Sequence, residues 1–463
     1  MGHLIPRTER VCLVKTQVTL SRFSRKGLVA VAALAVSAMS FAAMPAQAAG
    51  DPGVTDSEIV LGMQLPQTGA ASPGYNKVDD AMRAYFDYVN SKGGVYGRNI
   101  RLEVKDDKYS AGVTVSTASS LINDSKVFAM VGSVGTQTHS AVIKDLNRRG
   151  IPDLFVNSGN SGFYTDPKKY PTTFAGLGTY AAEAKILGKY IKENFADKKV
   201  GILYQSDDFG KNALAGFTTA GLVFTPRQNA ASFVAGTQGS LGLTSQIKQL
   251  QANGVQVVII AAVASATAIS VTTAKALGYA PDKWVVISVG SDATTFQTIL
   301  GSKGVPAATS AAMLAGVISA SHAPSPGDST DEYVAAFKKI NTDFNKGADT
   351  RWDNNVLQGM NIAYQTVEAL QGVGKDLTRK ALINWMETKG STLTSAALAP
   401  VGYSKTSHEA YTGFWIGAYD ATTVLKPVGA SRVVYTTDSG KGAVTVSTFK
   451  RPAIAADALP KAK

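Results

Sequence analysis

The chain has 463 residues, of which 45% are hydrophobic, and this length is enough to bury a core without disulfide bonds. Its single cysteine, Cys12, excludes a disulfide framework within the chain and a metal site built from several cysteines. The formal net charge is +12, but the basic residues form no stripe with interleaved aromatic residues, so a solvated basic surface is favoured over nucleic-acid binding.

The first 48 residues have the pattern of a secretory signal peptide. Basic residues precede an apolar run at 27–43, and Ala46-Gln47-Ala48 supplies the small residues that a signal peptidase recognises. We therefore expect residues 1–48 to be a signal peptide that is cleaved after Ala48. Cys12 lies before the apolar run, so it is not placed for lipid attachment. No later stretch approaches the ~18 to 20 apolar residues of a membrane span, so we expect an exported protein without one.

Beyond residue 51 the sequence alternates between apolar runs of strand length and amphipathic segments of helix length. Such alternation predicts βα units with parallel sheets and right-handed crossovers. The predicted strands are 59–65, 100–105, 127–131, 151–156, 200–204, 255–261, 284–288, 313–321, 414–419 and 431–435. The predicted helices are 77–91, 113–123, 138–149, 181–194, 210–221, 242–252, 264–277, 331–344, 356–370 and 380–388.

This pattern predicts an α/β protein with two doubly wound lobes, because a single lobe would be unusually large for the residues that follow the signal peptide. Residues 171–175 indicate a first crossing between the lobes, after which a second set of βα units begins. The expected boundaries are 55–174 for lobe 1, 175–316 for lobe 2, 317–400 for the return to lobe 1, 401–450 for lobe 2 with the late strands, and 451–463 for a flexible tail.

The stretch 127–163 supplies the candidate binding site. Two predicted strands each end in a small, polar, glycine-containing loop, and a helix connects them. In an open α/β sheet, ligands bind outside the carboxyl ends of the strands, where a helix N-terminus offers free backbone N–H groups to an anion. The candidate ligand-binding residues in these loops are Gly135, Thr136, Ser158, Asn160 and Ser161.

Other motifs are weaker. Residues 176–181 match the G-x-G-x-x-A dinucleotide pattern, but the preceding strand is weak and the next strand ends too far along the chain to supply the acidic ribose partner. A small-residue crossover loop is therefore favoured over a dinucleotide site. Thr179 in this loop is a candidate ligand contact. The histidines are scattered, and the exported chain contains no G-x-S-x-G motif. Paired carboxylates such as 207–208 more often cap a helix than act as acid and base. We therefore expect no metal, no cofactor and no enzymatic activity.

Three runs, GGVYGRNIRLEVKDDKYS at 93–110, VFAMVGSVGTQT at 127–138 and GILYQSDDFGKNALAGF at 201–217, resemble the branched-chain amino acid type of periplasmic substrate-binding protein. This family provides the receptor of an ABC transporter, and the resemblance covers about 55–420. It implies a type I fold of two lobes joined by a three-crossing hinge, a ligand in the cleft and hinge closure. It also implies a monomer in the periplasm that delivers a small-molecule ligand to a membrane permease.

The resemblance assigns roles to several residues. Thr136 stands where the family has a Ser or Thr whose hydroxyl and N–H take the ligand carboxylate, and Asn160 and Ser161 fall in the second carboxyl-end loop. Aromatic residues wall the cleft in the family, and ordinary core packing is an equal alternative for their counterparts in this chain. Those counterparts are Tyr75, Phe209 and Trp352.

One position departs from the family. Amino-acid binders place a Glu after the strand equivalent to 284–288, where it pairs with the ligand ammonium, whereas this chain has Gly290 there and Asp292 two residues on. Burying an ammonium without an anion is costly. We expect the ligand to be a small carboxylate-bearing or amino-acid-like compound. An amino-acid-like ligand would pair its ammonium group with Asp292, whereas a simple acid would not need this carboxylate. A ligand-presenting sensor subunit and an enzyme on the same scaffold remain alternatives.

Overall fold

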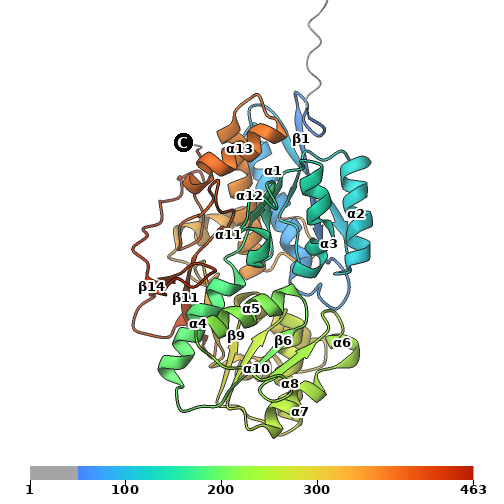
Figure 1. Cartoon of the computed structure of the whole chain (residues 1–463). Coiled ribbons are helices and arrows are strands. Elements are labelled where there is room, and N and C mark those ends of the chain that lie inside the picture. The colour runs from blue at the N-terminus through green and yellow to red at the C-terminus, as the bar shows by residue number, and fades with distance from the viewer. Residues whose placement is uncertain (1–50, 462–463) are drawn as a thin grey trace, which may run out of the picture. The chain divides into compact units, whose positions relative to one another are not determined.

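The predicted strands gather into two sheets in the part of the chain that this computed structural model describes, residues 51–461 (Figure 1). The signal-peptide prediction lies outside the described residues. The first sheet, in the order β2-β1-β3-β4-β5, is parallel throughout. Its strands are β1 Glu58–Leu65, β2 Asn99–Asp106, β3 Ala129–Val131, β4 Asp153–Val156 and β5 Thr173–Ala175. The helices that pack on it are α1 Val78–Ser91, α2 Ala111–Asn123, α3 Thr136–Arg148, α11 Glu332–Phe344, α12 Asn354–Val373 and α13 Arg379–Lys389. We call this assembly the first lobe.

The second sheet has the order β14-β13-β11-β10-β9-β8-β6-β7, with β12 paired to β11. The strands from β7 to β10 are parallel, and the C-terminal strands add to β10 in antiparallel fashion. These strands are β6 Val200–Gln205, β7 Ala230–Phe233, β8 Val257–Ala261, β9 Lys283–Val286, β10 Ile318–Ser321, β11 Gly413–Tyr419, β12 Leu425–Pro427, β13 Val434–Thr436 and β14 Thr445–Val446. Their helices are α4 Tyr180–Asn194, α5 Asp208–Thr219, α6 Gln238–Leu241, α7 Thr244–Ala252, α8 Ala264–Ala276, α9 Ala293–Gly301 and α10 Ala307–Leu314. This is the second lobe.

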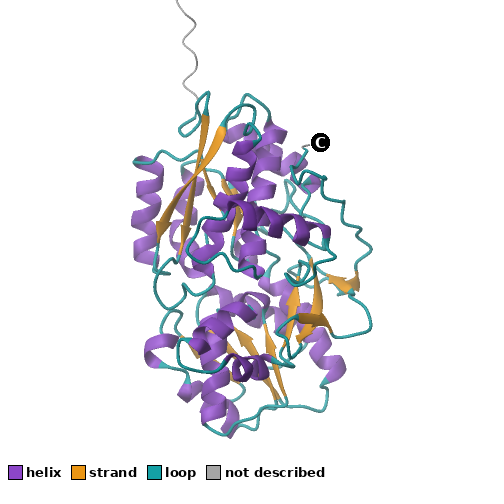
Figure 2. Ribbon diagram, turned by 180° about the vertical axis from the view of Figure 1, so that it is seen from behind, coloured by secondary structure: helices purple, strands orange, loops and turns teal. Residues whose placement is uncertain are grey.

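Helices cover both faces of the sheets (Figure 2), and the side chains of β1 show why. Successive residues of a strand point to opposite faces. Ile59 and Leu61 join the core that α1 and α12 cover, whereas Val60 joins a smaller cluster with residues of α2 and α3. Each strand therefore needs apolar residues on both faces, which explains the continuous apolar run of β8, whose five residues are fully buried. The doubly wound prediction is confirmed.

Several helices start at a residue whose side chain accepts hydrogen bonds from free backbone N–H groups. The Asp207 side chain accepts from Phe209 and Gly210 at the start of α5, and Asp331 and Asp353 do the same for α11 and α12. This agrees with the helix-capping interpretation of the pair at 207–208. These three carboxylates thus fix the residues at which α5, α11 and α12 begin.

The chain passes between the lobes close to the expected boundary at 174–175, but later than expected at 316–317. Residues 171–175 were predicted as a crossing, but β5 forms the edge of the first sheet, and the chain crosses just after it. Residues 317–400 were assigned to the first lobe, yet β10 pairs with β9 and β11, so the second crossing begins only after Ser321. The sequence of β10 consists of four apolar or small residues, and this pattern does not indicate which of the two sheets the strand joins.

The C-terminal residues also differ from the expectation of a flexible tail at 451–463. After β14 the chain crosses back to the first lobe, and residues 447–461, which we call the C-terminal strap, pack along it (Figure 1). The Arg451 guanidinium pairs with Asp331 at 2.6 Å, lies over the Tyr333 ring and donates to the Ala396 carbonyl. Tyr85 of α1 donates to the Ala458 carbonyl at 2.7 Å. One partly exposed arginine and several backbone carbonyls hold a segment whose Ala/Pro composition suggested disorder.

Within residues 51–461, every helix falls short of the combined length and apolar character needed to cross a membrane.

Candidate functional site

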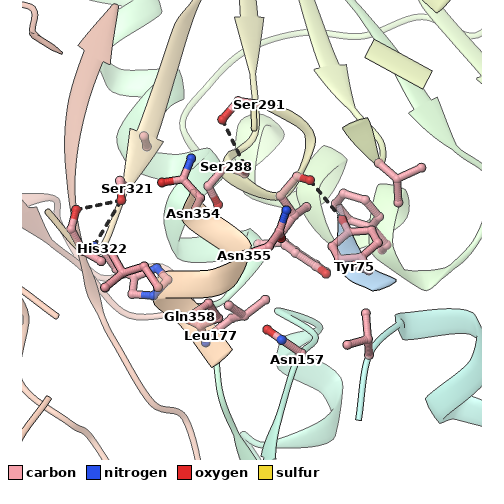
Figure 3. A pocket seen from close by; sticks show the side chains of 18 of the residues that line it. Tyr75, Asn157, Leu177, Ser288, Ser291, Ser321, His322, Asn354, Asn355 and Gln358 are labelled. Carbon is pink, nitrogen blue, oxygen red and sulfur yellow. Dashed lines mark hydrogen bonds between the residues drawn. The ribbon is translucent and has the colours of Figure 1, made fainter. Parts of the chain in front are cut away.

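A cavity lies between the two lobes at the carboxyl ends of their strands. The space open to the centre of a water-sized sphere is about 100 Å³, several times the ~10 to 15 Å³ that one water needs. Its walls come from loops of both sheets, from the start of α12, and from the two segments after β5 and β10 where the chain passes between the lobes (Figure 3). The lining residues are Tyr75, Tyr109, Val134, Gly135, Asn157, Leu177, Tyr180, Phe209, Val263, Ser288, Val289, Ser291, Ala320, Ser321, His322, Ala323, Asn354, Asn355, Leu357, Gln358, Tyr419 and Leu425.

The lining of this cavity contains no Asp, Glu, Lys or Arg side chain. Aromatic rings make up much of it: Tyr180 and Phe209, from the second lobe, lie with ring centroids 4.2 Å apart. The polar lining is neutral and consists of serine hydroxyls, amides such as Asn355 and Gln358, and an imidazole. Such a lining can form directional hydrogen bonds, but it cannot neutralise a buried charge with a side chain of opposite charge.

Hydrogen bonds join the lobes around the cavity, so the cleft is closed in this structure. The Tyr75 hydroxyl, in the first lobe, donates to the Val289 carbonyl of the second at 3.0 Å. Outside the cavity lining, the Asn212 amide of α5 donates to the Ser161 hydroxyl of the first lobe at 2.7 Å. The Arg351 guanidinium donates to the Thr298 hydroxyl of α9 at 3.1 Å. These contacts come from different elements, and each would break if the lobes separated.

Three of the residues that sequence analysis predicted for the site line this cavity: Tyr75, Gly135 and Phe209. Gly135 precedes α3 with a φ of 116°, a conformation that glycine adopts readily, and a Cβ there would lie 2.4 Å from the Thr138 hydroxyl. The start of α3 thereby comes close to the cavity. The dipole of this helix and its free N–H groups favour a negative group at that end.

Thr136 and Ser158 lie behind this wall and are not lining residues. The Thr136 hydroxyl is 2.7 Å from that of Ser158 and 3.4 Å from that of Tyr180, and both Thr136 and Ser158 are buried. Sequence analysis placed the Thr136 hydroxyl on the ligand. In the structure its partners are protein groups, and it links the end of one strand to the second lobe through Tyr180.

The remaining predicted residues lie elsewhere around the cleft. Asn160 caps a short 3-10 turn and lines a separate hollow, and the Ser161 hydroxyl accepts from Asn212 of α5. Thr179 caps α4, and its hydroxyl bonds to that of Ser439 at 2.6 Å. The Trp352 indole donates to the Pro326 carbonyl, and this side chain lines a neighbouring hollow together with Asp292.

The loop at Gly290 excludes the acidic side chain that amino-acid binders of the family place there. A Cβ on Gly290 would lie 2.3 Å from the Ala262 carbonyl oxygen, so any side chain would force the backbone apart. Asp292 caps α9, accepting from the Thr295 N–H at 2.6 Å, and lines the neighbouring hollow instead of the cavity. No carboxylate of the described chain therefore lines the cavity to receive a ligand ammonium.

A carboxylate does lie directly behind one wall. Glu183 of α4 is buried, and its oxygens accept from the Ser288 N–H at 2.6 Å and are 2.8 Å from the Ser288 hydroxyl. Burial raises the pKa of Glu183 to about 8, and the bonds from Ser288 partly oppose this shift. Glu183 thus holds the turn that carries Ser288 and Val289 against the cavity.

Sequence analysis missed most of the polar lining. Ser288 lies two residues after β9 and His322 directly follows β10, so the rule that ligands bind at the carboxyl ends of strands could have indicated them. Asn355 and Gln358 lie on the first turns of α12, far along the chain from the sheet that they face, and no local pattern marks them. In residues 51–461 no cluster of three or more His, Cys, Asp or Glu side chains is arranged to hold a metal ion.

Comparison with known proteins gives a consistent result. A family model described as periplasmic binding protein matches residues 58–423. A Leu/Ile/Val-binding protein homologue from Brucella melitensis is 25% identical over 35% of this chain and 44% of its own length. An amino acid binding protein from Pseudomonas aeruginosa is 25% identical over 50% of this chain and 58% of its own. The chain spans about half the length of the curated relatives it matches.

Solved structures share the fold at lower identity. A branched-chain amino acid ABC transporter protein from Thermus thermophilus with bound valine has a TM-score of 0.70 at 17% identity, covering 83% of this chain and 98% of that one. A fatty acid ABC transporter substrate-binding protein from Thermomonospora curvata also has a TM-score of 0.70, at 20% identity, covering 87% and 97%. These similarities support the type I two-lobe fold.

Proposed function

Because the chain belongs to the periplasmic binding protein family, we propose that it captures a small organic solute between its lobes and delivers it to the membrane permease of an ABC transporter. The observation that carries this proposal is the closed cavity, which takes its walls from both lobes. A ligand that touches both lobes favours the closed form over the open one, and a permease can recognise that difference. The site of action is the periplasm, and the protein acts as a monomer.

The ligand that fits best bears a carboxylate and lacks an ammonium group. Gly135 brings the start of α3 to the cavity, where backbone N–H groups and the helix dipole favour a carboxylate. No acidic side chain among the described residues lines the cavity, and Gly290 leaves no room for one. The relatives bind amino acids or fatty acids according to their names. A simple organic acid with an apolar or aromatic body matches this lining better than an α-amino acid does.

Mass spectrometry of what co-purifies with the protein tests this proposal. The protein is isolated from its native envelope and denatured, and the released compounds are identified. We expect an organic acid at about one per protein molecule. Adding that acid back should shrink the molecule in small-angle scattering and raise its melting temperature. Unchanged scattering with a tightly bound acid, or turnover of the acid into a product, would contradict a transport receptor.

A matching experiment in cells separates transport from sensing. Deleting the gene should abolish uptake of the radiolabelled acid, and restoring the wild-type gene should recover it. Normal uptake in the deletion strain, together with a lost transcriptional response to the acid, would assign the protein to a sensor.

A further inference from the structure

Most of the hydroxyl groups that line the cavity already donate their hydrogen within the protein. Four of them donate to backbone carbonyls, for example at 3.0 Å from Tyr75 and at 2.8 Å from Ser321 (Figure 3). Because a hydroxyl carries one hydrogen, these groups have only lone pairs left to offer a ligand. The four donors are Tyr75, Ser291, Ser321 and Tyr419, and the carbonyls that accept from them belong to Val289, Ser288, Ala323 and Ser291.

The Ser288 hydroxyl has a different partner, a side chain that can change its charge. Ser288 lines the cavity and is partly exposed. Behind it, Oε1 of Glu183 accepts from the Ser288 N–H at 2.6 Å, and Oε2 lies 2.8 Å from the Ser288 Oγ. Since an N–H group only donates, Oε1 acts as an acceptor whether Glu183 is charged or neutral. A proton on Glu183 therefore resides on Oε2, beside the serine oxygen.

The surroundings of Glu183 favour its neutral form. Its exposed fraction is 1%, and within residues 51–461 no lysine or arginine forms an ion pair with it. Burial without a cation raises the pKa of Glu183 to about 8. Lys185, on the same helix, pairs with Asp438 at 2.7 Å instead. The titratable side chains on the elements packed against α4 and the Ser288 turn are the exposed Asp208 and Lys211 of α5 and Lys275 of α8, together with Tyr419 of β11 and Tyr435 of β13.

The charge of Glu183 decides where the hydrogen of the Ser288 hydroxyl points. When Glu183 is ionised, Oε2 carries no hydrogen, and the serine hydroxyl donates to it. When Glu183 is neutral, its Oε2–H donates to Ser288 Oγ, and the serine hydrogen is released to turn toward the cavity. The neutral form thereby makes Ser288 a donor on a wall where most hydroxyl hydrogens are already in use.

We propose that Glu183 is a positioning residue for ligand binding: its proton frees the Ser288 hydroxyl to donate to an oxygen of the bound acid. This inference rests on the proposed function and adds a proton to it, because the anionic acid is held best when Glu183 is neutral. By linkage, the bound acid also favours the protonated form of Glu183. Affinity for the acid should therefore fall as the pH rises through about 8.

Isothermal titration at pH 6 and pH 9 tests this proposal. The probes are benzoate and 3-methylbutanoate, an aromatic and an aliphatic acid that are ionised at both pH values, and the acid that co-purifies with the protein is titrated alongside them. Wild-type affinity should be about 10-fold lower at pH 9, because only about a tenth of Glu183 is protonated there. At pH 9, titrations in two buffers of different ionisation enthalpy should show the uptake of nearly one proton per acid bound. A Glu183 that only holds the turn in place would produce neither effect.

Two variants separate the carboxyl group from the hydroxyl. In Glu183→Gln the amide oxygen can accept from the Ser288 N–H while the amide nitrogen donates to Ser288 Oγ, as the neutral carboxyl does. This variant should bind the acids equally well at pH 6 and pH 9 and take up no proton. Ser288→Ala lacks the donor, so its affinity at pH 6 should fall by roughly 10- to 150-fold, the range for a hydrogen bond to a charged group.

Glu409 provides a matched control. Its carboxylate also accepts from serine hydroxyls, those of Ser407 and Ser439, and burial raises its pKa as well. None of these three residues lines the cavity. Glu409→Gln should therefore keep the pH dependence and the proton uptake of the wild-type protein.

The outcomes separate the two proposals, and the wild-type titrations decide even if a variant fails to fold. If wild-type protein binds the acids equally at both pH values, takes up no proton, or keeps its pH dependence in Glu183→Gln, the role of Glu183 is refuted and the transport proposal stands. If wild-type protein binds neither probe acid, and the co-purified compound carries no acid group, the ligand class of the proposed function is refuted together with this inference.

Discussion

The hydroxyl of Tyr75 and the carbonyl of Val289 form a 3.0 Å hydrogen bond that joins the two lobes at the edge of the cavity. Burial raises the pKa of Tyr75, so its hydroxyl stays protonated and acts as a donor at any physiological pH. Val289 lies on the turn that Glu183 holds through Ser288. The bond therefore connects a first-lobe side chain to a rigid part of the second lobe.

Tyr75→Phe removes this bond and little else. We expect ligand affinity to fall by roughly 2- to 13-fold, which corresponds to the ~0.5 to 1.5 kcal/mol of a neutral hydrogen bond that exists only in the closed form. Isothermal titration with the co-purified ligand measures this. Tyr96→Phe is the control, because the Tyr96 hydroxyl also donates to a carbonyl, that of Gln371, but within the first lobe. An equal loss in both variants would argue against a closing role for Tyr75.

Thr136→Val should affect folding stability more than ligand contact. The Thr136 hydroxyl is bonded to Ser158, which is fully buried, so its removal leaves a buried hydroxyl short of a partner. We expect the free energy of unfolding to fall by about 1 to 3 kcal/mol in urea titrations. Thr136→Ser keeps the hydroxyl and should lose less. A large loss of affinity at unchanged stability would place this hydroxyl on the ligand after all.

Arg451→Met should destabilise the protein, because it leaves the Asp331 carboxylate buried without its cation. The two side chains are only 13% and 8% exposed, and breaking such pairs typically costs roughly 3 to 5 kcal/mol. Arg148→Met removes an exposed ion pair with Asp145 and should change stability by less than about 0.5 kcal/mol. Chemical denaturation of both variants gives the comparison, and similar values for the two would show that the strap is loosely held.

Glu183 should make stability depend on pH. Its pKa rises from 4.5 to about 8 on folding, so the native state holds a proton that the unfolded chain releases first. The stability from this group is complete below pH 4.5 and is lost as the pH rises toward 8, by up to roughly 1.4 kcal/mol per pH unit. Glu183→Gln cannot ionise, so its unfolding free energy should fall less between pH 5 and 8. Parallel pH profiles for the two proteins would refute this assignment.

The strands with continuous apolar runs could be predicted from the sequence because burial on both faces needs apolar residues at every position, as in β8. The elements that were missed have weaker patterns. α9 and α10 are short and rich in small residues, and β7 is a four-residue strand that begins with two alanines. Their structure depends on packing against neighbours, which no short window of sequence contains.

For the candidate site, the rule that ligands bind at the carboxyl ends of the strands identified the loop at Gly135. This rule could not predict the direction in which a side chain points. The Thr136 hydroxyl turns toward Ser158 because that strand end lies beside it in the sheet. His322 and Gln358 meet through the crossings, from positions that only the three-dimensional structure brings together (Figure 3). Residues contributed by the hinge therefore escaped a prediction made from one strand-helix-strand unit.

The C-terminal strap sets the order in which the molecule can be assembled. Tyr85 of α1 bonds to the carbonyl of Ala458, so two parts of the described chain that are 373 positions apart meet in one core. Most strands of the second lobe precede residue 322 and can pair while synthesis continues. The first lobe, whose strands leave the ribosome before those of its partner, is completed only when the strap has followed.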